Sequence, residues 1–222
     1  MSIRENLAQL KESLPEGVKL VAVSKTKPIE DIKAAYDAGH KIFGENKAQE
    51  MINKQPELPE DIEWHFIGHL QSNKVKYLAP FVSMIHSVDR KKILKEINKE
   101  AKKNDRVIDC LLQFHIAEEE SKFGLSMDEA REMIESEAFQ EYANVKIRGV
   151  MGMATFTDDT DQVRREFKEL KKIFDRLQTE YFDNESFTEI SMGMSGDYPI
   201  AIEEGSTIVR VGSKIFGARN YQ

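Results

Sequence analysis

Cysteine and long apolar runs are scarce in this chain of 222 residues, and their scarcity narrows the class of protein. The single Cys110 cannot form an intramolecular disulfide, which suits a reducing compartment, and its apolar neighbours predict a packed thiol rather than a nucleophile. No run approaches the roughly 20 apolar residues of a membrane span. The N-terminal segment lacks the apolar core of a signal peptide. We therefore expect a cytoplasmic protein that does not enter a membrane.

Basic charge is also in short supply, with 32 lysines and arginines against 39 acidic residues and a net charge of −7. A nucleic-acid backbone needs a basic field, so nucleic acid is not expected as a partner. The net charge does not exclude one small phosphate as a ligand, because backbone dipoles at turns and helix starts can hold it. Metal binding is not expected either, since His65 and His69 have no cysteine or carboxylate at metal-ligand spacing.

Apolar segments alternate between strand and helix patterns along the whole chain. A capping box at Ser2 and Glu5 opens a first helix, and eight strands then alternate with helices. The predicted strands cover 20–24, 41–46, 63–68, 82–88, 107–116, 145–153, 187–192 and 208–212. The predicted helices between them cover 29–38, a segment ending near 55, 72–78, 90–103, 126–139, 160–181 and 198–204.

This alternation predicts an α/β fold, a closed (β/α)8 TIM barrel with an extra N-terminal helix. With 40% apolar residues the chain can bury one large core, so we expect a single domain over 1–222. The rival fold is an open doubly wound sheet. That fold usually carries a G-x-G-x-x-G turn after its first strand, and this sequence has none there.

Lys25 lies where the first predicted strand gives way to a loop, in the segment Ser24-Lys25-Thr26-Lys27-Pro28. Pro28 can begin the following helix, because its missing N–H is not needed at the first helical position. A lysine at a strand end is part-buried, which disfavours its charged form and lowers its pKa. A neutral amine of this kind can attack an aldehyde and hold it as a Schiff base. The alternative is an ordinary surface lysine.

The barrel fold predicts where other functional side chains gather. Active sites in such barrels lie at the carboxyl ends of the strands, and phosphate often binds after strands seven and eight. The polar or small residues at those ends include Asn46, Ser191, Ser195, Arg210, Gly212 and Ser213. The turns around 191–197 and 211–213 offer backbone N–H groups and hydroxyls to an anion. Asp197 is expected to cap the next helix and turn away. Two ordinary tight turns are the alternative.

Arg210 lies within an apolar strand, where an arginine needs a partner. It stays protonated, so facing a pyridine nitrogen it would keep that nitrogen unprotonated. A structural salt bridge is the alternative. Of the remaining polar residues, we expect His86 to be a hydrogen-bonded core or loop residue and Lys122 to lie on the surface.

Six segments carry a family resemblance, and they occur in order over nearly the whole chain. They are 22–28 (AVSKTKP), 43–46 (FGEN), 64–74 (WHFIGHLQSNK), 121–125 (SKFGL), 191–195 (SMGMS) and 209–217 (VRVGSKIFG). Together they resemble the pyridoxal phosphate homeostasis protein family, the single-domain relative of the alanine racemase barrel. The resemblance implies pyridoxal 5′-phosphate (PLP) as cofactor, held as an aldimine on Lys25. It also implies contacts from Ser195, Gly212 and Ser213 to the phosphate, from Arg210 to the pyridine nitrogen, and from Asn46 near the ring.

The function implied by this resemblance is to store, buffer or hand on PLP, with no turnover and no catalytic residue. PLP-dependent apo-enzymes are candidate recipients, and we expect a monomer. Racemases of this fold bring a second acid–base group, a tyrosine, from a separate C-terminal domain. The sequence ends at Gln222, a few residues past the eighth strand, so that domain is expected to be missing. An arginine at the ring nitrogen would further limit carbanion stabilisation.

Two enzyme functions stand as alternatives. One is a PLP-dependent racemase or lyase acting on a small amino acid. The other is a class I aldolase, which uses a Schiff-base lysine without a cofactor. For the aldolase, Lys146 on the sixth strand competes with Lys25, but it is predicted at the start of its strand, the non-catalytic end of a barrel.

Overall fold

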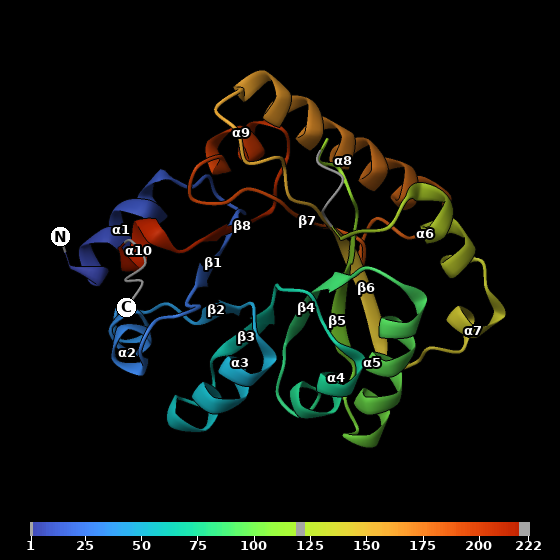
Figure 1. Ribbon diagram of the computed structural model, residues 1–222, viewed down its shortest axis with the longest axis horizontal. Helices are drawn as coiled ribbons and strands as arrows, with labels where there is room; N and C mark the ends of the chain where they lie inside the picture. The colour runs from blue at the N-terminus through green and yellow to red at the C-terminus, as the bar shows by residue number, and fades with distance from the viewer. Residues whose placement is uncertain (1, 119–122, 218–222) are drawn as a thin grey trace.

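The fold is a closed barrel of eight parallel strands in sequential order, with helices on the outside (Figure 1). It is given by a computed structural model that describes residues 2–118 and 123–217. Each strand pairs with its sequence neighbours, and the first strand pairs with the last, which closes the barrel. The predicted (β/α)8 architecture is therefore confirmed.

Seven of these strands are shorter than the predicted ranges and fall within them, and β1 has the predicted length but begins one residue earlier. They are β1 (Lys19–Val23), β2 (Ile42–Glu45), β3 (Glu63–Phe66), β4 (Met84–Val88), β5 (Ile108–Gln113), β6 (Val145–Met151), β7 (Glu189–Ser191) and β8 (Ile208–Val211). The helices between them are α2 (Ile29–Asp37), α3 (Ala48–Lys54), the 3-10 turn Gln55–Glu57, α4 (Ser72–Leu78), α5 (Lys91–Lys103), α6 (Met127–Ile134), α7 (Glu137–Gln140), α8 (Thr160–Glu180) and α9 (Tyr198–Glu203).

The extra N-terminal helix is α1 (Ile3–Ser13), and it begins as the sequence predicts. The backbone N–H of Ser2 donates to Glu5 at 2.8 Å, and the N–H of Glu5 donates to the Ser2 hydroxyl at 3.3 Å, which completes the capping box. The helix lies beside α10 (Ser213–Phe216), the last helical turn described (Figure 1). The Asn6 side-chain amide donates to the carbonyl of Ile215 at 3.0 Å and joins the two.

Two hydrophobic layers hold the barrel together. Most of the apolar core lies between the strands and the surrounding helices, as expected where a parallel sheet is covered by helices. A smaller cluster of buried residues forms separately: Val21, Met84, Leu111, Met151 and Ile208. These come from β1, β4, β5, β6 and β8, so this cluster fills the inside of the barrel.

Two helical segments differ from the prediction. The single helix expected over 126–139 is divided into α6 and α7, with Ser136 at the break. The Ser136 hydroxyl donates to the carbonyl of Met133 at 2.7 Å, a local bond that competes with the helical pattern. The turn α10 was not predicted, because it starts directly after β8 and contains only four residues.

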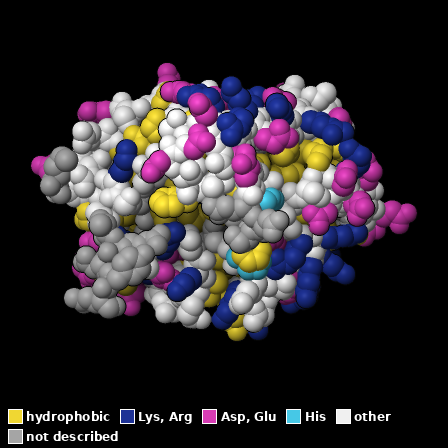
Figure 2. Space-filling view, turned by 45° about the horizontal axis from the view of Figure 1, so that its top comes forward, with side chains coloured by type: hydrophobic (Ala, Val, Ile, Leu, Met, Phe, Trp, Pro, Cys, Tyr) yellow, Lys and Arg dark blue, Asp and Glu magenta, His cyan; other side chains and the backbone are white. Residues whose placement is uncertain are grey.

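The outer surface carries acidic and basic side chains interspersed over the face seen in Figure 2. None of the described helices is long and apolar enough to cross a membrane.

Candidate functional site

The amine predicted to be central, Lys25, follows β1 at the carboxyl end of the barrel and is half-buried. The register pairs Val23 with Gly44 on the neighbouring strand β2. Asn46 follows Gly44 by two residues, as Lys25 follows Val23, so both lie just beyond the ends of adjacent strands. The structure therefore brings Lys25 and Asn46 to the same part of the barrel mouth.

The turns after β7 and β8 touch each other at Ser195 and Gly212. The Gly212 N–H donates to the Ser195 hydroxyl at 3.3 Å. Gly193 has a φ of +94°, a conformation that L side chains rarely adopt, and its carbonyl accepts from the Arg210 N–H at 2.9 Å. Ser213 follows as an exposed first residue of α10. The two predicted turns therefore contact each other directly.

Gly212 also connects these turns to the strand that precedes Lys25. A Cβ added at Gly212 would lie 2.8 Å from the carbonyl oxygen of Val23, closer than side chains normally approach a backbone. The absence of a side chain is what allows β1 and the last turn to approach so closely. Because Val23 lies two residues before Lys25, the turns after β7 and β8 and the Lys25 amine lie at the same end of the barrel.

Asp197 corrects a detail of the sequence prediction. It occupies the position before α9, as expected for a cap, but its side chain makes no capping bond to that helix. Its carboxylate instead accepts the backbone N–H of Met194 and closes the 193–197 turn from within. The sequence could not distinguish these two uses, since both place the carboxylate next to nearby N–H groups.

Arg210 lies inside the barrel and is only 4% exposed. Its Nη1 donates to the hydroxyl of Ser191 at 2.6 Å, and its Nη2 donates to the carbonyl of Gly152 at 3.0 Å. Burial lowers the pKa of Arg210 to about 10, partly offset by the charge of Asp197, so the guanidinium is still protonated at neutral pH. Since both bonds go to neutral oxygens, a salt bridge is not what holds it. Donor capacity remains for a further acceptor.

A chain of buried polar side chains continues from Arg210 through the barrel. Nδ1 of His86 lies 2.9 Å from the Ser191 hydroxyl, and Nε2 of His86 lies 2.9 Å from Nδ1 of His65. Burial lowers the pKa of His65 to about 3, and burial also lowers the pKa of His86 well below its ordinary value. Both imidazoles are therefore neutral at physiological pH.

This relay was only partly visible in the sequence. His86 was predicted as a hydrogen-bonded core or loop residue, and its complete burial within β4 makes it a core residue. Its link to Arg210 through Ser191 was missed. The available signal was the presence of polar residues within the apolar strands β3, β4, β7 and β8. If such residues point inward, the barrel brings them close to one another, where they must hydrogen-bond.

The remaining candidates lie at the edge of the mouth or away from it. His69 is exposed, lies 3.1 Å from a carboxylate oxygen of Asp89, and stacks on Phe123 with ring centroids 4.0 Å apart. Lys122 lies outside the described residues. Lys146 is exposed near the start of β6, at the opposite end of the barrel from Lys25. Over residues 2–118 and 123–217, no group of three or more His, Cys, Asp or Glu side chains could hold a metal ion.

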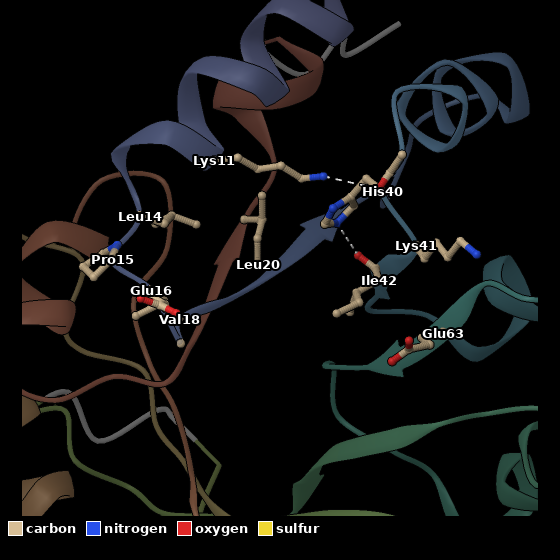
Figure 3. A pocket seen from close by; sticks show the side chains of 12 residues that line it. Lys11, Leu14, Pro15, Glu16, Val18, Leu20, His40, Lys41, Ile42 and Glu63 are labelled. Atoms are coloured by element: carbon tan, nitrogen blue, oxygen red, sulfur yellow. Dashed lines mark hydrogen bonds between the residues drawn. The ribbon is translucent and has the colours of Figure 1, made fainter.

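A hollow of about 540 Å³ lies at the other end of the barrel, around the starts of β1, β2 and β3 (Figure 3). Two of the polar side chains that line it, Lys11 and His40, make hydrogen bonds to backbone carbonyls. Lys11 donates to the carbonyl of Gly39 at 3.3 Å, and a ring nitrogen of His40 lies 2.9 Å from the carbonyl of Ile42. This hollow is therefore separate from the residues that the sequence singles out.

The mouth at the carboxyl end can recognise a molecule with three features. Lys25 offers an amine to a carbonyl carbon, and the joined turns offer N–H and hydroxyl groups to an anion. The Arg210 guanidinium offers an N–H donor to a neutral acceptor. PLP carries an aldehyde, a phosphate and a pyridine nitrogen, so the residues present fit this cofactor.

Comparison with known proteins first defines the class. The family described as "Alanine racemase, N-terminal domain" matches residues 1–220. An alanine racemase structure from Clostridium difficile 630, in complex with cycloserine, has a TM-score of 0.81 at 14% identity. The alignment covers 100% of this chain and 60% of that one. That likeness concerns the fold alone. The chain is thus a barrel of the alanine racemase N-terminal class.

Closer relatives define the family within this class. Proteins named pyridoxal phosphate homeostasis protein are 45% identical over 204 residues in Aquifex aeolicus, covering 91% of this chain and 88% of that protein. In Pasteurella multocida the identity is 39%, covering 100% and 99%. PipY of Synechococcus elongatus PCC7942 is 35% identical and covers 97% of this chain and 100% of its own. It has been solved without PLP, with a TM-score of 0.91, and with PLP bound, with a TM-score of 0.88. This chain belongs to the pyridoxal phosphate homeostasis protein family.

Proposed function

We propose that this protein binds PLP at the carboxyl end of its barrel and serves PLP homeostasis as a holding protein. The observation that carries the proposal is the contact of Gly212 with Val23, which sets the anion-binding turns beside the strand leading to Lys25. The names of the relatives and the PLP-bound structure of PipY support the same function.

Each predicted site residue has a role in this proposal. The Nζ of Lys25 holds the aldehyde carbon of PLP covalently, and Asn46 lies beside the ring. Ser195, Gly212 and Ser213 bind the phosphate through hydroxyl and backbone N–H groups. Arg210 donates to the pyridine nitrogen. Ser191 is completely buried below that arginine and acts by orienting it.

The donor at the ring nitrogen favours holding the cofactor over turning substrates over. Bound PLP supplies an electrophilic carbon and an electron sink, and the sink is strongest when the ring nitrogen is protonated. A protonated Arg210 can only donate a hydrogen bond, so it cannot accept one from a protonated ring nitrogen. It therefore favours the unprotonated form of the pyridine nitrogen. This is consistent with relatives that are named for homeostasis and not for a reaction.

The finer features of the function form part of the same proposal. Residues 1–222 act as one PLP-binding unit that works as a monomer in the cytoplasm, where the buried thiol of Cys110 needs no partner. PLP-dependent apo-enzymes are the recipients of the cofactor.

A titration with PLP tests the function directly. We expect wild-type protein to become yellow and to retain PLP through gel filtration. Lys25→Ala should stay folded and lose the colour, because Lys25 lies beyond the end of β1 and outside the strand ladder of the barrel. Assays with alanine, serine and threonine distinguish the alternatives. Turnover above that of free PLP would favour a racemase or lyase, and a protein left colourless by PLP would favour an aldolase.

A further inference from the structure

Three charged side chains lie against the loop that carries Lys25. Glu45 is the last residue of β2, and Glu50 and Lys54 come from α3. The Lys54 ammonium donates to the carboxylates of Glu45 at 2.8 Å and Glu50 at 2.7 Å, and to the backbone carbonyl of Ser24 at 2.9 Å. One ammonium thus joins two acidic residues to the residue that precedes Lys25.

The same cluster binds the residues on both sides of Lys25. The Ser24 hydroxyl donates to Glu45 at 2.6 Å, and the backbone N–H of Thr26 donates to Glu50 at 2.5 Å. Thr26 has a φ of +63°, in the left-handed region that is uncommon for a β-branched residue. Such a conformation persists only where the surroundings enforce it, and the bond to Glu50 is one such constraint.

Stability alone does not account for this arrangement. Lys54 is 7% exposed and Glu45 is completely buried, so both charges lose hydration on folding. A buried ion cluster of this kind is often no more stable than apolar residues of similar volume. Burial also raises the pKa of Glu45, which means that its ionised form is disfavoured despite the nearby ammonium. Burying these charges is costly, and the cluster is hydrogen-bonded to the residues on both sides of Lys25. Both observations fit a role in the site.

We propose that Lys54, with Glu45 and Glu50, is a positioning residue for Lys25. The cluster fixes the backbone before and after Lys25 and so sets where its amine stands at the barrel mouth. This inference rests on the proposed function, in which Lys25 holds PLP. The family resemblance implies no role for the segment after β2, and this inference gives it one.

The first test needs no cofactor. Hydrogen exchange at the Thr26 amide and the rate at which acetic anhydride acylates Lys25 are measured in PLP-free wild type, Lys54→Met, Lys54→Arg and Glu50→Leu. We expect loss of Thr26 protection and a changed acylation rate and pH profile in Lys54→Met and Glu50→Leu, with recovery toward wild type in Lys54→Arg. Lys171→Met is the control, since it removes an exposed ion pair with Asp175 on α8.

The second test uses PLP-loaded protein and measures the rate of PLP release. Lys54→Met removes the charged hydrogen bond to the Ser24 carbonyl and leaves Glu50, which accepts from the Thr26 N–H, without its ammonium partner. PLP release should therefore be faster by about tenfold or more in Lys54→Met. Glu50→Leu keeps the Lys54–Glu45 pair, so it remains informative if Lys54→Met fails to fold. Wild-type release and acylation in a folded Glu50→Leu or Lys54→Met would overturn the inference. Wild type that never forms a bond between PLP and Lys25 would instead overturn the proposed function.

Discussion

Nη1 of Arg210 lies 2.6 Å from the hydroxyl oxygen of Ser191 inside the barrel. A guanidinium can only donate, so the Ser191 oxygen accepts this bond and its own proton is available for Nδ1 of His86, 2.9 Å away. We infer that His86 carries its proton on Nε2 and donates it to Nδ1 of His65. Each of the three contacts then joins one donor to one acceptor, with both imidazoles neutral.

The tautomers of His65 and His86 are the first prediction. Because each Nδ1 accepts a hydrogen bond, both rings should be neutral with the proton on Nε2. Nitrogen-15 NMR chemical shifts report the state of each ring nitrogen. We expect the Nε2–H form for both residues from pH 7 down to pH 5. An imidazolium signal for either residue at pH 6 would contradict the direction of the relay.

Acid sensitivity of folding is the second prediction. The pKa of His65 is lowered from 6.5 to about 3 by burial, so below pH 6.5 the unfolded chain binds a proton that the folded chain does not. Stability should therefore fall as the pH falls, by about 2 kcal/mol for this histidine between pH 7 and pH 5. His86 acts in the same direction, and so does His40, whose pKa burial lowers to about 4.

Urea unfolding at the two pH values measures this loss. His65→Gln removes one titrating ring while keeping polar atoms at that position, so it should lower stability at pH 7 but reduce the difference between pH 7 and pH 5. An unchanged difference would mean that His65 titrates normally in the folded protein.

The third prediction concerns Ser191, which the structure makes a support for Arg210. Ser191→Ala leaves a buried imidazole nitrogen and a guanidinium N–H without their partner, and should lower the free energy of unfolding by roughly 1–3 kcal/mol. It should also shift the absorbance band of bound PLP, since Arg210 is no longer held in place.

Ser206 provides a matched control for Ser191. It is also buried, and its hydroxyl donates to the carbonyl of Met192 at 2.7 Å, but it has no bond to Arg210. Ser206→Ala should lower stability without moving the PLP band. Equal spectral effects in both variants would show that Ser191 has no special relation to the cofactor.

The fourth prediction separates two glycines near the anion-binding turns. A side chain at Gly212 would approach the Val23 carbonyl to 2.8 Å, whereas a side chain at Gly196 would meet nothing within 4 Å. Gly212→Ala should therefore displace the turn from β1 and weaken PLP binding by about tenfold or more, equivalent to about 1.4 kcal/mol. Gly196→Ala should bind PLP nearly as wild type does. Equilibrium titration of both variants makes the comparison, and equal affinities would remove Gly212 from the site.

The sequence was sufficient for the architecture because local signals agreed with the global fold. The capping box at Ser2 and Glu5, the apolar strands and the helices between them all point to the same barrel. Strand ends were harder to predict, since Gly212, the residue after β8, continues the apolar pattern beyond the end of the ladder. The division of α6 from α7 depends on a single hydroxyl bond at Ser136, which no periodicity reveals.

The positions of the candidate site residues could be predicted where topology alone decides them, and not where side-chain packing decides them. Lys25 and Arg210 follow from the rule that strand ends and adjacent strands meet at the mouth. The bond between His86 and Ser191 joins residues 105 positions apart, so its existence depends on the inward direction of both side chains. Lys54 resembles any lysine at the end of a surface helix, and only the folded chain reveals its burial.

Reduction with borohydride shows directly which lysine holds PLP. The protein is saturated with PLP, reduced, digested and analysed by peptide mass spectrometry, which locates any lysine that carries a phosphopyridoxyl group. We expect the group on Lys25 of the wild type and none in Lys25→Ala. A phosphopyridoxyl group on another lysine, or none in the wild type, would contradict it.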